Sequence, residues 1–207
     1  MKNKRLWILI GGIVLISIAF LLLNFRLAVS NTQAIQRIIT TELEGHYPDR
    51  LQPTDKVSLV LAGEGPLVRA LQIALTEKMD KAGMGQIELV GELEPEYPNP
   101  VLVVKVGRPS PIWTPFFAMS QFSIHTGYGS NGDSTFIQVN LASMEGTRTT
   151  VGSKNSSTLN LFAEYEVNDR SFGLISRLGY HQYLADYLAQ EIVQALKNLY
   201  NIQDIGG

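Results

Sequence analysis

Three histidines are the side chains of this sequence best suited to acid–base or metal chemistry. His46, His125 and His181 stand far apart, and none belongs to a His-x-x-x-His or His-Glu-x-x-His pattern, the spacing that places two metal ligands on one helix face. A serine hydrolase would also need a hydroxyl and a carboxylate, such as Ser110 and Asp133, but no Gly-x-Ser-x-Gly turn holds a nucleophile. We therefore predict no catalytic and no metal-binding residues. The alternative is a hydrolase whose site is assembled only by the fold.

Two further patterns could bind phosphate groups or cations. Gly63 and Gly65 separate a strand pattern from a helix pattern, but Val68 stands where the dinucleotide-binding fingerprint needs its third glycine. We interpret this segment as a tight turn. A run of alternating carboxylates lacks the spacing of a calcium-binding loop and is interpreted as a solvated charged edge, so no cofactor is predicted. Its members are Glu88, Glu92, Glu94 and Glu96.

The segment 108–119 combines three prolines with aromatic and apolar side chains between two predicted strands. Prolines exclude it from the regular pairing of a central strand. It either folds over an open end of the core as a lid, or it exposes a rigid apolar patch of the kind that binds protein partners or a lipid interface. On the second interpretation the partner-binding residues are Arg108, Ile112, Trp113, Phe116 and Phe117.

An uncharged apolar run precedes these segments. It extends from Leu6 to Leu23, with Ser17 as its one clearly polar residue, and as a helix it would be ~27 Å long, close to the ~30 Å hydrocarbon core of a bilayer. Positive residues at positions 2, 4 and 5 precede it, which favours a cytoplasmic N-terminus. We therefore predict cytoplasmic residues 1–5, a single-pass anchor over 6–23 in the plasma (inner) membrane, and an extracytoplasmic remainder. A cleaved signal peptide is the alternative.

The elements that must position the candidate residues follow this run. Apolar residues at helical spacing, after a Ser30 and Gln33 capping box, predict a membrane-proximal helix over 31–44, and a connector completes the segment 24–55. Residues 56–200 are expected to form the domain and 201–207 a frayed tail. Apolar runs over 56–62, 86–90 and 101–106 predict strands. A helix pattern between the first two of them predicts a parallel β-α-β unit.

The later part of the chain has a different periodicity. Period-two alternation over 122–126, 137–141 and 159–167 predicts antiparallel strands, joined in part by a loop over 146–157, and a long amphipathic helix follows over 180–199. The strand–helix–strand–strand order over 56–107 resembles the small β-α-β-β modules of several bacterial envelope accessory proteins. The predicted fold class is α+β. It comprises an N-terminal transmembrane helix and a two-layer domain, in which helices cover one face of a mixed sheet.

Composition excludes several classes of function. Residues 31–207 hold 13 basic and 19 acidic side chains, a net charge of −6, which repels phosphate backbones and argues against nucleic acid as a partner. The absence of cysteine excludes disulfides, thiolate zinc sites and cysteine nucleophiles. We predict a membrane-anchored extracytoplasmic binding or assembly protein with an envelope protein or lipid as its partner. A scaffold subunit of a membrane complex, using the 31–44 helix, is a further alternative.

Overall fold

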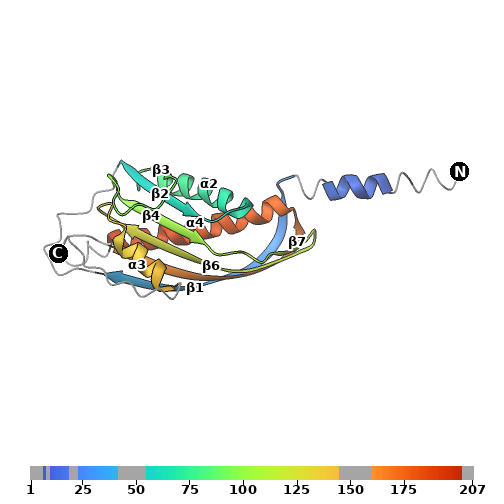
Figure 1. Cartoon of the computed structure of the whole chain (residues 1–207). Coiled ribbons are helices and arrows are strands. Elements are labelled where there is room, and N and C mark those ends of the chain that lie inside the picture. The colour runs from blue at the N-terminus through green and yellow to red at the C-terminus, as the bar shows by residue number, and fades with distance from the viewer. Residues whose placement is uncertain (1–6, 8–9, 19–22, 42–54, 145–159, 202–207) are drawn as a thin grey trace.

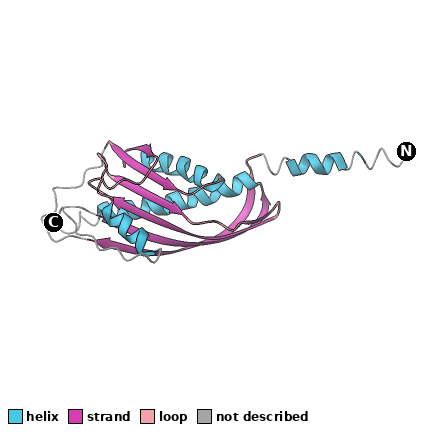
Figure 2. Cartoon of the chain, in the orientation of Figure 1, coloured by secondary structure: helices cyan, strands magenta, loops and turns pink. Residues whose placement is uncertain are grey.

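The computed structural model of the chain describes residues 7, 10–18, 23–41, 55–144 and 160–201. These residues form one mixed β-sheet with helices packed on it (Figures 1 and 2). The elements, in chain order, are β1 Arg26–Thr41, β2 Lys56–Ala62, α2 Pro66–Lys81, β3 Gln86–Val90, β4 Val101–Val106, β5 Ile112–Thr114, β6 Phe117–Gly129, α3 Thr135–Met144, β7 Asn160–Ile175 and α4 Arg177–Asn201. The predicted α+β class with a mixed sheet is confirmed.

The strand order explains how the sheet combines two kinds of pairing. It is β1-β7-β6-β4-β2-β3, with β5 paired to the start of β6. The strands β2 and β3 pair in parallel, as the helix between them predicted, and β4 joins β2 in parallel on its other side. The long strands β1, β7 and β6 are antiparallel to their neighbours. They extend beyond β4 at the end where the β5–β6 hairpin lies, which we call the hairpin end, and we call the opposite end the far end.

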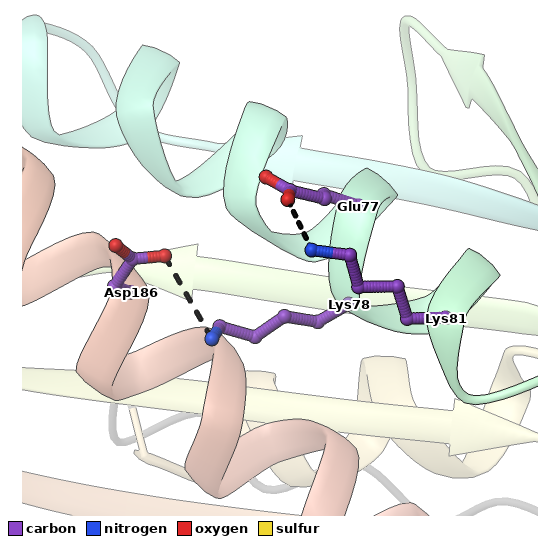
Figure 3. Close-up of polar contacts among 4 residues, drawn as sticks. All are labelled: Glu77, Lys78, Lys81 and Asp186. Atoms are coloured by element: carbon purple, nitrogen blue, oxygen red, sulfur yellow. Dashed lines mark hydrogen bonds and ion pairs between the residues drawn. The ribbon is translucent and has the colours of Figure 1, made fainter.

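Two helices cover one face of the sheet, which we call the inner face. The apolar stripes of α2 and α4 bury Leu71, Leu75, Leu188 and Ile192 against strand residues such as Leu59 in the main core cluster. On their solvent side the two helices are joined by an ion pair between Lys78 Nζ and Asp186 Oδ1, 3.8 Å apart, and Lys81 binds Glu77 one turn away (Figure 3). Exposed pairs of this kind stabilise by ~1 kcal/mol at most, so burial of the stripes is what holds this layer.

The opposite, outer face is also covered, but only at the far end. Here α3 buries Ile137 against Val60, Val103 and Phe162 in a second core cluster. The close approach requires a glycine in β6, because a Cβ on Gly127 would lie 2.3 Å from Ile137 Cγ2. The sequence prediction of helices on one face only is therefore wrong. The apolar residues that alternate over 137–141 were predicted to form a strand, but they belong to the short helix α3.

A second correction concerns the segment 24–55. Residues 26–41 form β1, which pairs with β7 along its whole length from Arg26 with Ile175 to Thr41 with Asn160, so the membrane-proximal helix predicted over 31–44 is wrong at the described residues 31–41. Ile35 and Ile38, three residues apart, would share one face of a helix but lie on opposite faces of β1, and antiparallel pairing with a long neighbour outweighs this local spacing. The segment is thus part of the sheet, and the scaffold role assigned to a 31–44 helix loses its structural basis.

The predicted membrane anchor is also corrected. Within the described residues, none of the helices has both the length and the apolar character that a bilayer crossing requires. The helix near the N-terminus is described at residues 7 and 10–18. The single-pass topology over 6–23, the cytoplasmic N-terminus, and the location at the plasma membrane with an extracytoplasmic domain, all built on that anchor, are overturned by this finding.

Three predictions fall on other parts of the chain. Cytoplasmic residues 1–5 and the loop over 146–157 lie outside the described residues, as do His46 and all of the tail predicted over 201–207 except Asn201, which ends α4.

Candidate functional site: an apolar patch at the hairpin end

Large apolar side chains gather on the outer face at the hairpin end, where α3 does not reach. Strand register places Leu27 beside Leu174, Val29 beside Phe172, and Phe172 beside Phe117. The rings of Phe117 and Phe172 are in contact, with centroids 5.0 Å apart. Period-two alternation places these side chains together, because the odd-numbered residues of β1 and β6 and the even-numbered residues of β7 point to the outer face.

The β5–β6 turn extends the same surface. Its backbone is fixed to β7 by two hydrogen bonds, from Gly173 N to Phe116 O at 3.0 Å and from Ile175 N to Pro115 O at 2.9 Å. Five of these outer-face residues, Leu27, Val29, Ile112, Phe172 and Leu174, are 39–81% exposed, and Phe116 in the adjoining turn is 67% exposed. With the half-buried Phe117 they form what we call the hairpin patch. A contiguous apolar surface held on paired strands is typical of a protein-binding site.

The structure divides the five residues predicted to bind a partner. Ile112, Phe116 and Phe117 lie in the hairpin patch, whereas Trp113 points to the inner face and packs against the main core cluster. Arg108 is exposed in the connector between β4 and β5. The segment 108–119 thus contributes both to the core and to the surface, because alternation along β5 sends Trp113 to the core and its neighbours to the surface.

Beneath the patch, the inner face of the hairpin end holds a hydrogen-bonded cluster that sequence reasoning missed. Asp169 is fully buried, and its carboxylate accepts hydrogen bonds from Thr32 Oγ1 at 2.6 Å, Tyr180 OH at 2.8 Å and Ser171 Oγ at 3.0 Å. Asp169 and Arg170 are neighbours within β7. Only Arg170 is exposed, because β7 continues through both positions. The parity of the buried residues 161–167 predicts that position 169 also faces inward.

The cluster closes into a ring that joins β1 to β7 and α4. Ser171 accepts a hydrogen bond from Ser30, which accepts one from Arg26. The Arg26 guanidinium lies 3.7 Å from the centre of the Tyr183 ring, and the Tyr183 hydroxyl is 2.5 Å from Thr32 Oγ1. We call this set the polar ring: Arg26, Ser30, Thr32, Asp169, Ser171 and Tyr183. Each of its hydroxyls has a partner, so the ring fixes β1 in place rather than offering an activated nucleophile.

Tyr180 extends the polar ring into α4. Burial raises the pKa of its phenol above the ordinary value, and the nearby Asp169 carboxylate raises the pKa further. The phenol therefore stays protonated and serves as a hydrogen-bond donor to Asp169.

The best acid–base pair in the described chain lies on the outer face, between the patch and α3. His125 Nε2 is 3.5 Å from Glu164 Oε1, and the imidazole stacks on Phe162 with ring centroids 6.4 Å apart. The other two residues considered for a hydrolase triad, Ser110 and Asp133, lie in other parts of the structure. Asp133 caps the start of α3 by accepting from Thr135 N at 2.8 Å, and Ser110 is exposed in the connector before β5. These two positions give the hydrolase interpretation no support.

The remaining candidates are placed in structural roles. Gly63 and Gly65, both with positive φ, form the turn into α2, as predicted. Glu88 lies 3.8 Å from Lys56 across β2 and β3, and the loop after β3 is held by the Tyr97 hydroxyl, 2.6 Å from both Glu92 O and Glu94 N. Over the described ranges, no three His, Cys, Asp or Glu side chains are grouped so that they could hold a metal ion.

His181 is buried in α4. Burial lowers its pKa, and the Arg177 charge lowers the pKa further. A neutral imidazole packed in the helix layer is a structural residue.

Comparison with known proteins gives a limited result. No protein-family model and no curated protein sequence matches the chain. The solved structures to which the chain is similar include a PelC dodecamer from Paraburkholderia phytofirmans and a single-residue variant of it. The dodecamer is 11% identical with a TM-score of 0.37, and the variant is 12% identical with a TM-score of 0.35. Each alignment covers 77% of this chain and 95% of the other. Likenesses this remote carry no argument about the function of this chain.

Proposed function

We propose that this chain is a binding protein that assembles with another protein through the hairpin patch. The observation that carries the proposal is the exposure of Val29 (81%) and Phe172 (60%), adjacent residues on paired strands. Isolated exposed apolar residues are ordinary, but neighbouring ones that include an aromatic pair resemble the centre of a protein interface.

The way in which the patch is held supports the same role. Its strands are tied from beneath by the polar ring, and the turn that carries Phe116 is hydrogen-bonded to β7. A surface that is already ordered loses little conformational entropy when a partner docks, so more of the contact energy remains as affinity. Aromatic side chains such as Phe116 and Phe172 supply large contact areas with few rotatable bonds.

The experiment is site-specific photocrosslinking in the cells that produce the protein. A photoreactive phenylalanine analogue at Phe116 should yield a discrete adduct with another protein. The same analogue at Ile73, which is 66% exposed on α2, should yield none. Phe172→Ser should then remove the adduct formed from position 116 while leaving the thermal unfolding temperature unchanged. Equal yields from the two positions, or an adduct that survives Phe172→Ser, would refute a partner-binding role for the patch.

A further inference from the structure

The outer edge of β1 carries a different binding property from the hairpin patch. Among the described strands, β1 pairs with β7 along Arg26–Thr41 and stands at the end of the strand order. A strand in that position directs half of its N–H and C=O groups away from the sheet, where they can pair with a further strand. One of these groups, the Ala34 N–H, is engaged by the Tyr187 hydroxyl of α4. Figure 1 shows β1 running along the border of the molecule from the hairpin end to the far end.

The two edges of this sheet differ in how they are protected. The opposite edge, β3, is five residues long and carries Glu88 in an ion pair with Lys56. In contrast, β1 has 16 residues with no proline, lysine, aspartate or glutamate, and its two charges are Arg26 and Arg37. Short length, charge and proline are the usual devices that keep an edge from pairing. The strand β3 has two of them, whereas β1 is long and almost uncharged.

We propose that β1 pairs antiparallel with β1 of a second copy of this chain, so that two sheets become one across a two-fold axis at Thr32. A two-fold axis perpendicular to the sheet keeps the helices of both copies on the same side. Residues that lie opposite each other must then point to the same face of the sheet, so both are odd-numbered or both are even-numbered. With Thr32 opposite itself, the paired stretch covers residues 26–38 of both strands, a length of ~44 Å.

This register makes β1 complementary to itself. On the outer face Val29 lies opposite Ile35 of the second copy, Asn31 lies opposite Gln33, and Leu27 lies opposite the aliphatic stem of Arg37. Each of these pairs is formed twice. Apolar pairs with β-branched members and amide pairs are favourable cross-strand neighbours, and no two like charges are opposed.

Neighbouring registers are poorer. Moving the axis to Asn31 places Val29 opposite Gln33, so the pair of β-branched residues is lost. Moving it to Gln33 places Val29 opposite Arg37 and Ile35 opposite Asn31, which opposes an apolar to a polar residue at both sites. The register centred on Thr32 is thus selected by the sequence of β1 itself.

The polar ring prepares β1 for this pairing. Thr32 is bound to Asp169 and to Tyr183, and Arg26 lies on the Tyr183 ring, so the inner side of the strand is fixed to β7 and α4. The outward side chains of Val29 and Ile35 are 81% and 63% exposed. A second copy therefore meets an edge whose position is already fixed by β7 and α4. Because the strands pair antiparallel, the dimer carries its two hairpin patches at opposite ends.

Cysteine pairing tests the register directly, because the chain contains no cysteine. Opposed residues of an antiparallel pair have Cα atoms ~4.5–5.5 Å apart, within the range of a disulfide. Full-length Asn31→Cys and Gln33→Cys chains, tagged differently and mixed under mild oxidation, should form a mixed disulfide dimer. Neither chain should form a disulfide dimer by itself. Absence of the mixed product, or equal crosslinking of Asn31→Cys alone, would overturn the proposal.

Sedimentation of the full chain tests the association without any crosslink. The wild-type chain should sediment as a dimer at ~100 µM. Ile35→Lys should weaken the dimer at least ~10-fold, because it places a lysine opposite Val29 at two points. The matched control is Leu89→Lys on β3, where Leu89 is 52% exposed, and it should leave the dimer intact. A monomeric wild-type chain, or a dimer that Ile35→Lys leaves unchanged, overturns the pairing. Photocrosslinking from position 116 to a different protein would still support the proposed function, so the two failures are distinguishable.

Discussion

Phe162 and Phe172 lie on the same face of the same strand, ten residues apart, and have opposite environments. Phe162 is 1% exposed beneath α3, whereas Phe172 is 60% exposed in the hairpin patch. The inner face shows a second contrast, since the far end is packed with apolar side chains and the hairpin end contains the polar ring. The far end of the sheet is thus built for stability. The hairpin end is built to hold a surface in place while leaving it uncovered.

The largest expected effect on stability comes from removing the buried side chain of Phe162. Phe162→Ala should lower the free energy of unfolding by ~3–5 kcal/mol, because it removes the side chain on which α3 packs and leaves a cavity. Chemical denaturation followed by circular dichroism measures this directly. If α3 contributed nothing to the core, the loss would instead be close to that of a surface substitution, below ~1 kcal/mol.

The next effect concerns the polar ring. Asp169→Ala should lower the free energy of unfolding by ~2–4 kcal/mol, because the hydroxyls of Thr32, Ser171 and Tyr180 lose their shared acceptor in a buried site. The matched control is Glu166→Ala, an exposed carboxylate on the same strand, for which a change within ~0.5 kcal/mol is expected. Equal values for the two variants in the same denaturation assay would mean that the ring does not fix β1.

Alkaline titration compares the two ends through their buried phenols. Burial raises the pKa of Tyr165 to about 12, and it also raises the pKa values of Tyr128 at the far end and Tyr180 at the hairpin end. The unfolded chain loses these protons near the ordinary value of 10.0, so the stabilisation is fully present below pH ~10 and is lost as the pH rises further. Absorbance at the tyrosinate band should show these phenols titrating only as the chain unfolds. Titration of all tyrosines near pH 10 with the fold intact would contradict this.

The smallest effect on stability is expected at the hairpin patch. Phe172→Ala should change the free energy of unfolding by no more than ~1 kcal/mol, since the side chain is mostly in water in the isolated chain. It should nevertheless remove the crosslink from position 116. A loss as large as that of Phe162→Ala would show that Phe172 belongs to the core, and the contrast between the two ends would disappear.

Local pattern was sufficient for part of this fold and insufficient for the rest. The bounds of β2, β3 and β4 and the parallel β-α-β unit follow from short apolar runs separated by glycine and proline. The strand β1 was mistaken for a helix, and α3 for a strand. Their apolar spacings favour the wrong period, and only the distant partners β7 and Phe162 override it.

The candidate site was predictable in its position but not in its composition. Proline and aromatic residues marked the segment 108–119, and Phe116 and Phe117 do lie in the patch. The larger part of the patch comes from β1 and β7, which no local pattern joins to that segment. Asp169 was missed because a carboxylate inside an alternating strand usually marks its end. Its burial depends on hydroxyl donors from Thr32 and Tyr180, which lie 137 and 11 residues away in the sequence.

The entry of the chain into β1 has a mechanical consequence. Residues 23–25 lead directly into this strand at the hairpin end, from which the 10–18 helix extends away from the domain (Figure 1). Tension applied between that helix and the C-terminal end of α4, which lies at the far end, would shear β1 along β7 rather than unzip it one residue at a time. The load is shared among the hydrogen bonds of all 16 residues, and the resistance to forced unfolding is set by one high barrier. The edge of the sheet is therefore the element best placed to bear a pulling force.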